Sequence, residues 1–211
     1  MQNSNARRAR HRPSSLAWLA AFGLVLSLTG CGYNGIQTLD QGVKGAWAEV
    51  LNQYQRRADL IPNIVATVKG EADFEQSTLT AVTEARASVG RVNAGPNTPD
   101  DPATFQKFQQ SQGELTSALS RLLVVTENYP NLKANAAFQD LRAQLEGTEN
   151  RIAIARKRYI DSVQAYNTQI ALIENWLGKV MTGAKEKPQF TVENEATISR
   201  PPTVEFPTQK K

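Results

Sequence analysis

The sequence predicts an all-α protein: an antiparallel four-helix bundle with long first and last helices and a disordered C-terminal tail. Three observations predict this fold class. Apolar residues recur at seven-residue spacing over long stretches, which is the period of a helix that packs along a partner. A loop rich in proline, glycine and asparagine at 93–100 separates two such stretches. No alternation of period two, which would indicate strands, extends over a comparable length.

The first helix is expected from about Asn34 to Phe74. Its apolar face contains residues at helical spacing: Ile36, Leu39, Val43, Trp47, Val50, Tyr54, Ile61, Ile64 and Val68. Pro62 lies inside this stretch and has no N–H to donate to the carbonyl of Ala58. We therefore expect a kink or a local break between Ala58 and Asn63.

The second helix is expected over 75–92 and the third after the loop. Asp101 is a suitable N-cap for the third helix, and Pro102 suits its first turn. Pro130 is expected to end the third helix, because a proline biases the preceding residue, here Tyr129, away from helical angles.

The fourth helix, expected over 134–176, has the most regular pattern. Every seventh position is large: Phe138, Leu145, Ile152, Tyr159, Tyr166 and Ile173. The second row has mostly smaller residues: Leu141, Thr148, Ala155, Ser162 and Gln169. A strict seven-residue repeat implies a left-handed supercoil. Trp176 is interpreted either as an exposed contact for a partner or as a cap on the apolar end of this helix.

The N-terminal segment has the pattern of a bacterial lipoprotein signal. Four arginines (Arg7, Arg8, Arg10 and Arg12) precede an apolar run over 16–28, and Leu-Thr-Gly-Cys ends at Cys31. The run is shorter than the ~20 residues of a spanning helix. We expect residues 1–30 to be removed and Cys31 to carry lipid, so that the domain is membrane-anchored in the cell envelope, outside the cytoplasm. The alternative is an uncleaved membrane anchor.

The predicted mature chain therefore consists of a bundle domain over 31–181 and a proline-containing flexible tail over 182–211. The whole chain has 24 Lys and Arg against 20 Asp and Glu, and the four leader arginines account for the difference. A balanced charge gives no electrostatic support for binding to nucleic acid.

Composition also argues against common catalytic chemistry. The only histidine, His11, precedes Cys31, and Cys31 is the only cysteine. The usual pairs of nucleophile and base therefore cannot form in the mature chain. We expect no enzymatic activity, no metal and no cofactor.

Four polar residues lie close together in the first helix: Arg56, Arg57, Asp59 and Asn63. Arg57 continues the seven-residue register of the apolar row, so we expect it to need an acidic partner, either Glu127 or Glu149. One interpretation is a network that sets helix pairing; the other is a docking notch for a partner, loosened by Pro62.

Lys133 is interpreted as a solvated turn residue or, less favoured, as a recognition point. Arg57→Leu is expected to change stability or pairing, and Lys133→Ala neither.

The polar positions resemble those of the LemA family along the whole predicted mature chain. The matching segments are Tyr33-Asn34, Trp47, Arg56–Asn63, Val82–Ala87, Glu127–Asn135 with Phe138, Glu149–Ala153 with Arg156, Tyr159, Val163, Tyr166 and Asn167, and Pro202–Phe206. The resemblance implies a four-helix bundle on a membrane anchor and a family without an established enzymatic activity. It also implies that the protein acts beside other membrane proteins of the envelope. Many relatives have a transmembrane helix where this chain has Cys31.

Two functions remain open from the sequence. The favoured one is a lipid-anchored scaffold or adaptor whose tail acts as a peptide ligand, with Val204 and Phe206 as anchors. The alternative is a carrier for a small apolar or lipid ligand held between helices. The small residues of the fourth helix favour close helix packing and argue against a roomy cavity.

Overall fold

The computed structural model describes residues 15–71, 74–172 and 176–191, with backbone alone for 15–32 and 177. Its elements are α1 (Ser15–Lys69), α2 (Gln76–Arg91), the 3₁₀ turn η1 (Thr98–Asp100), α3 (Pro102–Thr126), α4 (Pro130–Ala134), α5 (Ala136–Ala171) and α6 (Trp176–Thr182). The described residues contain helices and no strand. The predicted all-α fold class is therefore confirmed.

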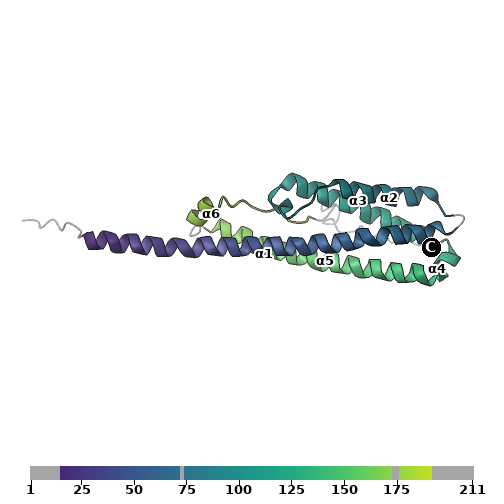
Figure 1. Ribbon diagram of the computed structural model, residues 1–211, viewed down its shortest axis with the longest axis horizontal. Helices are drawn as coiled ribbons and strands as arrows, with labels where there is room; N and C mark the ends of the chain where they lie inside the picture. The colour runs from purple at the N-terminus through teal and green to yellow at the C-terminus, as the bar shows by residue number, and fades with distance from the viewer. Residues whose placement is uncertain (1–14, 72–73, 173–175, 192–211) are drawn as a thin grey trace, which may run out of the picture.

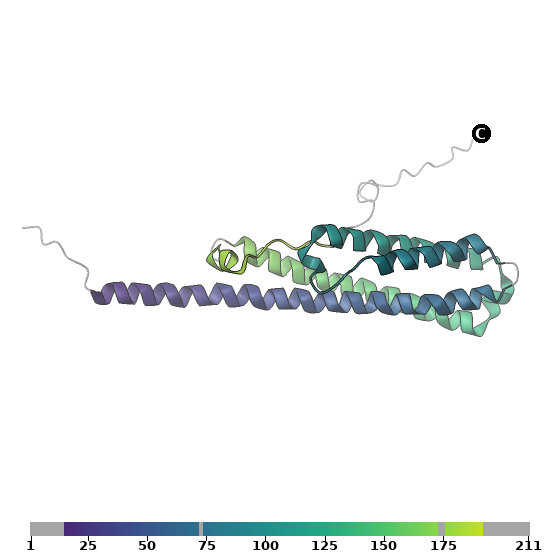
Figure 2. The same cartoon turned by 45° about the horizontal axis from the view of Figure 1, so that its top comes forward.

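The four long helices form two antiparallel pairs. α1 packs along α5, and α2 packs along α3. Figures 1 and 2 show α1 and α5 as a long pair, with the α2–α3 hairpin against the half of α1 remote from the N-terminus. α1 extends beyond every other helix at its N-terminal end (Figure 1). We call the end of the bundle next to Cys31 the near end and the end next to Lys69 the far end.

Pro62 does not interrupt α1, so the break expected around it is absent. The helix is continuous from Ser15 to Lys69. The carbonyl of Ala58, which Pro62 cannot reach with an N–H, accepts a hydrogen bond of 3.2 Å from Nε of Arg86 in α2. A neighbouring helix therefore replaces the hydrogen bond that the proline removes.

The starts of α3 and α5 are fixed by side-chain caps. Asp101 accepts from the Ala103 N–H at 3.0 Å and Pro102 occupies the first turn of α3, as predicted. α3 ends at Thr126, and Pro130 opens the short helix α4, which the sequence pattern did not indicate. Asn135 then caps α5 by accepting from the N–H groups of residues 137 and 138 at 2.9 and 3.2 Å.

α5 departs from the strict repeat expected for it. The predicted large row is buried from Phe138 to Tyr166, while Ile173 lies outside the described residues. Beyond Tyr159 the second row consists of Val163 and Ile170. Ser162 and Gln169, the expected seam residues, are half-buried. The second row therefore shifts by one residue between Ala155 and Val163, so the strict seven-residue repeat expected along α5 is broken once. The helix also ends at Ala171 rather than at 176.

The first part of the predicted tail is packed on the bundle. Gly183, with φ of 64°, turns the chain after α6 in a left-handed conformation that suits glycine. Residues 184–191 then run back along the helices, and Lys187 and Phe190 are buried. The expectation of a flexible tail from residue 182 is therefore wrong for this stretch, which we call the strap. Residues 192–211 lie outside the described residues.

Candidate functional site

A polar layer divides the interior of the bundle into two apolar cores. The near core consists of Ile36, Val43, Trp47, Val50, Tyr54, Phe105, Phe108, Ile152, Ala155, Tyr159, Val163, Tyr166, Ile170 and Phe190. The far core consists of Ile61, Ile64, Val68, Phe74, Leu79, Val82, Leu115, Leu119, Leu122, Leu132, Phe138 and Leu145. Between them, at one level of three helices, lie Arg57 of α1, Gln112 of α3 and Glu149 of α5.

Arg57 is the centre of this layer and is 1% exposed. Its Nη1 donates to Glu149 Oε1 at 3.0 Å and to Thr116 Oγ1 at 2.8 Å. Its Nη2 donates to the backbone and side-chain oxygens of Gln112. The guanidinium carbon lies 4.9 Å from the ring centroid of Tyr54. The buried Nε has no hydrogen-bond partner. The layer therefore ties α1 to both α3 and α5 at one register.

The other polar residues of the predicted cluster do not join Arg57. Arg56, Asp59 and Asn63 are exposed on α1. Glu127, the second acid considered for Arg57, instead pairs with Lys133 at 2.7 Å and with Arg142 at 3.0 Å. Hydrogen bonds from those two cations lower the pKa of Glu127. The predicted set therefore separates into an internal layer, an exposed face of α1 and an exposed ion-paired turn at the far end.

Lys187 fixes the strap to the near half of the bundle. Its ammonium group pairs with Asp40 of α1 at 2.9 Å and with Asp100 of η1. Its backbone N–H and C=O each form a hydrogen bond of 3.0 Å with the side-chain amide of Asn167. Tyr159 donates to the carbonyl of Pro188 at 2.9 Å. The strap thus connects α1, η1 and α5.

Phe190 completes the near core from the strap. Its ring centroid lies 5.0 Å from Phe105, 5.5 Å from Tyr159 and 6.1 Å from Trp47. The guanidinium carbon of Arg156 lies 4.5 Å from the centroid of Phe190. These separations are typical of favourable aromatic pairs. The strap is therefore part of the core and not a covering loop.

Titration of the ion pairs predicts that acid releases the strap. Burial raises the pKa of Asp40, but hydrogen bonds and charge from Lys187 and Lys44 outweigh it, so that the pKa is lowered overall. Asp40 therefore stabilises the folded state above its unfolded pKa of about 3.9, and this contribution is lost as pH falls through the lower folded pKa. We expect the near-ultraviolet circular dichroism of the aromatic cluster to fall below about pH 4.

Two variants separate this effect from general acid unfolding. Asp40→Asn should weaken the acid-dependent step in the aromatic signal. Asp161→Asn, which removes an exposed acid paired with Lys157 at 2.7 Å, should leave that step unchanged. Equal acid profiles for both variants would contradict a role for Asp40 in holding the strap.

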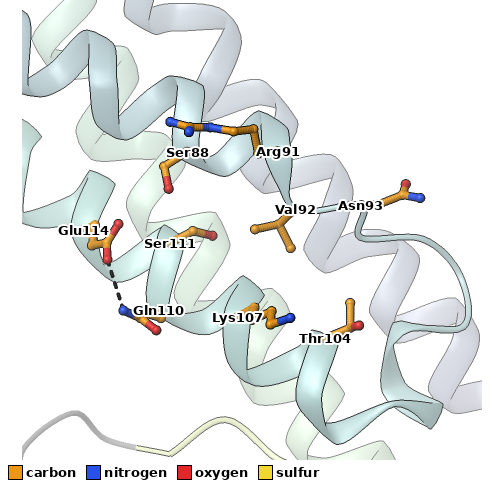
Figure 3. Close-up of a pocket in the computed structure, with 9 residues that line it drawn as sticks. All are labelled: Ser88, Arg91, Val92, Asn93, Thr104, Lys107, Gln110, Ser111 and Glu114. Atoms are coloured by element: carbon orange, nitrogen blue, oxygen red, sulfur yellow. Dashed lines mark hydrogen bonds between the residues drawn. The ribbon is translucent and has the colours of Figure 1, made fainter.

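A groove of about 600 Å³ lies between α2 and α3. Figure 3 shows its lining, with Arg91 and Lys107 among mainly polar side chains. A second groove of about 580 Å³, between α1, α2 and α3, has Tyr54 and Phe108 in its lining. Both are open grooves. Apolar side chains line parts of the second groove and a smaller open groove of about 320 Å³ between α1 and α2, where Ile61, Pro62 and Val65 lie.

The strap is the part of the site that the sequence interpretation missed. Its prolines and charges predict mobile chain, and no pattern in the sequence singles out Lys187. A usable signal was nevertheless present: Tyr159, Tyr166 and Asn167 are among the residues of the LemA resemblance. Two of them bond to the strap, and Lys187 Nζ lies 5.1 Å from the ring centroid of Tyr166.

The side chain of Cys31 and the residues Val204 and Phe206 lie outside the described parts of the chain. Thr191, the last described residue, has its carbonyl bonded by Nε2 of Gln109 at 2.9 Å. It lines a groove of about 290 Å³ with Gln112 and Thr116 of α3. The last described residue of the chain therefore lies beside the polar layer.

These features define a class of protein: an all-helical bundle built on one long N-terminal helix, divided by an internal polar layer and closed by a C-terminal strap. The LemA family profile matches residues 46–206, which includes the polar layer and the strap. The chain belongs to the LemA family.

Three curated relatives are similar to this chain. The magnetosome proteins MamQ 1 and MamQ 2 of Paramagnetospirillum magneticum are each 25% identical over 156 residues, and MamQ of Magnetospirillum gryphiswaldense is 24% identical over 156 residues. Each match covers 65% of this chain and 57% of the relative. The chain therefore spans little more than half of the length of these relatives.

Proposed function

We propose that this chain is a lipid-anchored envelope protein that acts as a helical scaffold or adaptor for other envelope proteins. Cys31 is the attachment point, and the bundle lies outside the cytoplasm. The bundle catalyses no reaction and takes no cofactor. Its partners are membrane proteins of the envelope.

The continuity of α1 carries this proposal. Ile36, the first buried side chain described in α1, comes five residues after Cys31, and the same helix then lines both cores. A lipid on Cys31 would hold the near end directly at a membrane. At 1.5 Å per residue, Lys69 would lie about 57 Å from the anchor. Among the residues whose side chains the structure describes, no helix is long and apolar enough to cross a membrane.

The distribution of polar groups supports an adaptor. The polar layer is internal, so it fixes the register of the helices and leaves their outer faces free. Arg56, Asp59 and Asn63 lie exposed on the far half of α1. The ion-paired turn of Glu127 and Lys133 is exposed at the far end. A rod held at its near end would present both surfaces away from the membrane.

Loss of the thiol tests the anchor. Cys31→Ser is expected to move the protein from the membrane pellet to the soluble envelope fraction, because the sulfur is the acylation point. Helical circular dichroism and melting should not change. Gly32→Ser, a small change at the next residue, should keep the protein in the pellet. A Cys31→Ser protein that stays in the membrane after a high-salt wash would contradict the lipid anchor.

The same strains test the adaptor role. A photo-crosslinking residue at Asn63 should capture an envelope membrane protein in cells that retain Cys31, and capture should fall in the Cys31→Ser strain. The control position for the crosslinking residue is Gln164, which is exposed on the near half of α5. Adducts of equal yield at both positions, or none at Asn63, would contradict a partner surface on the far half of α1.

A further inference from the structure

An exposed apolar patch lies at the near end of the bundle. Seven large apolar side chains are exposed among the residues described: Tyr33, Val124, Ile154, Leu172, Trp176, Val180 and Met181. Five of them lie at this end, and we call these five the near-end patch: Tyr33 of α1, Leu172 just after α5, and Trp176, Val180 and Met181 of α6. Trp176 and Val180 are four residues apart, so they share one face of α6. Trp176 is 62% exposed, so it does not cap the apolar end of α5.

α6 is held beside the part of α1 that follows Cys31. It packs against α1, as Figure 2 shows at the near end of the bundle. Thr182 and the residues after it line one groove with Ile36 and Asp40. The pairing of Lys187 with Asp40 fixes the chain just beyond α6. The near-end patch is therefore a fixed surface, a few residues along the axis from the predicted anchor.

We propose that the near-end patch rests in the interfacial region of an anionic lipid bilayer, with Trp176, Val180 and Met181 as the inserted side chains. This inference rests on the proposed lipid at Cys31, because that lipid brings the bilayer to this end of the bundle. An indole with one polar N–H suits the interface between headgroups and acyl chains.

A basic residue on the patch itself suits an anionic lipid surface. α6 contains Lys179 and no acid, whereas the exposed Lys185 that follows α6 is succeeded by the exposed Glu186, so the attraction rests on Lys179. Basic residues that flank apolar side chains add attraction to anionic headgroups. The patch would act as a second point of attachment and set the angle of the rod to the membrane, which one flexible lipid cannot do.

The test uses the tryptophans of the acylated protein, which begins at Cys31. Removal of residues 1–30 takes Trp18 away and leaves Trp47, fully buried in the near core and bonded to Gly95, and the exposed Trp176. The protein is reconstituted in phosphatidylglycerol–phosphatidylethanolamine vesicles with brominated acyl chains. We expect quenching and a blue shift of the emission, and Trp176→Phe should abolish both, because Trp47 is shielded.

A matched pair of charged substitutions adds the control. Val180→Asp should abolish the quenching of Trp176, whereas Val124→Asp, on the more exposed Val124 of α3, should preserve it. Unquenched, water-like Trp176 emission in protein that floats with the vesicles would overturn the inference and leave the lipid anchor standing. Protection of Trp176 from iodide without lipid, together with a dimeric mass, would overturn it in favour of a second copy on the patch.

Failure of the proposed lipid anchor at Cys31 would give a different result from failure of the near-end patch. Protein that floats with vesicles equally well after Cys31→Ser would contradict the proposed lipid attachment. The loss of Trp176 quenching in Val180→Asp would still support insertion of the near-end patch.

Discussion

Glu149→Ala is expected to lower the free energy of unfolding by about 3 kcal/mol, because it leaves the guanidinium of Arg57 charged in the interior without its anionic partner. Arg57 is 1% exposed, whereas the side chain of Glu149 is 39% exposed. The arginine keeps only neutral acceptors on Gln112 and Thr116 after the change. A loss of this size corresponds to a fall in melting temperature on the order of 10 °C for a bundle of this length.

The difference in exposure between Arg57 and Glu149 predicts a smaller loss of stability when the arginine is removed instead. Arg57→Leu is expected to cost about 2 kcal/mol, because Glu149 can be hydrated while the buried side-chain oxygen of Gln112 loses a donor. The double variant should be about as stable as Arg57→Leu alone, since no unpaired interior cation then remains.

Lys133→Ala is the surface control for this comparison. The Lys133–Glu127 pair has both side chains nearly half exposed, so its removal should change the free energy of unfolding by less than about 0.5 kcal/mol. Chemical denaturation of the four proteins measures all these values. A cost for Glu149→Ala no larger than for Lys133→Ala would mean that the polar layer does not hold the helices together.

The polar layer shows how much of a buried site a sequence pattern can predict. The register of α1 placed Arg57 inside because the seven-residue row on which it lies is otherwise apolar. Which of the two acids, Glu127 or Glu149, pairs with Arg57 depends on how the helices are shifted along one another. The pattern of a single helix does not contain that information. Glu127 belongs to the turn after α3, where Lys133 and Arg142 lie nearer to it.

The composition of the strap predicts mobile chain, and this prediction is wrong for a physical reason. Prolines and scattered charges prevent a helix, but they do not prevent an extended segment from being buried. Lys187 is stabilised by two carboxylates and Phe190 by an aromatic cluster, and those partners come from α1, η1, α3 and α5. A segment whose every contact is distant in sequence has no periodic signature. The break around Pro62 was likewise overestimated, because Arg86 of another helix satisfies the carbonyl of Ala58.

Phe190→Ala is expected to release the strap at a cost of about 3 kcal/mol, which is typical of a large aromatic side chain removed from a core. Its ring contacts Trp47, Phe105 and Tyr159, so no single neighbour can fill the space. The cost should appear first as local opening, because the strap is a short segment held by the Phe190 ring, the ion pairs of Lys187 and a few hydrogen bonds of its backbone. Hydrogen exchange at the amide of Lys187, which donates to Asn167, should accelerate on the order of a hundredfold.

Gln189→Ala is the matched control, because Gln189 is the exposed neighbour of Phe190 in the same strap. It should leave the Lys187 amide protected and the melting temperature unchanged. In Phe190→Ala, amides of α5 near Ile152 should stay protected while the strap exchanges, since the helix pairs do not depend on it. Uniform acceleration throughout α5 would instead mean that the strap and the bundle unfold as one cooperative unit, and that the near core cannot form without its C-terminal segment.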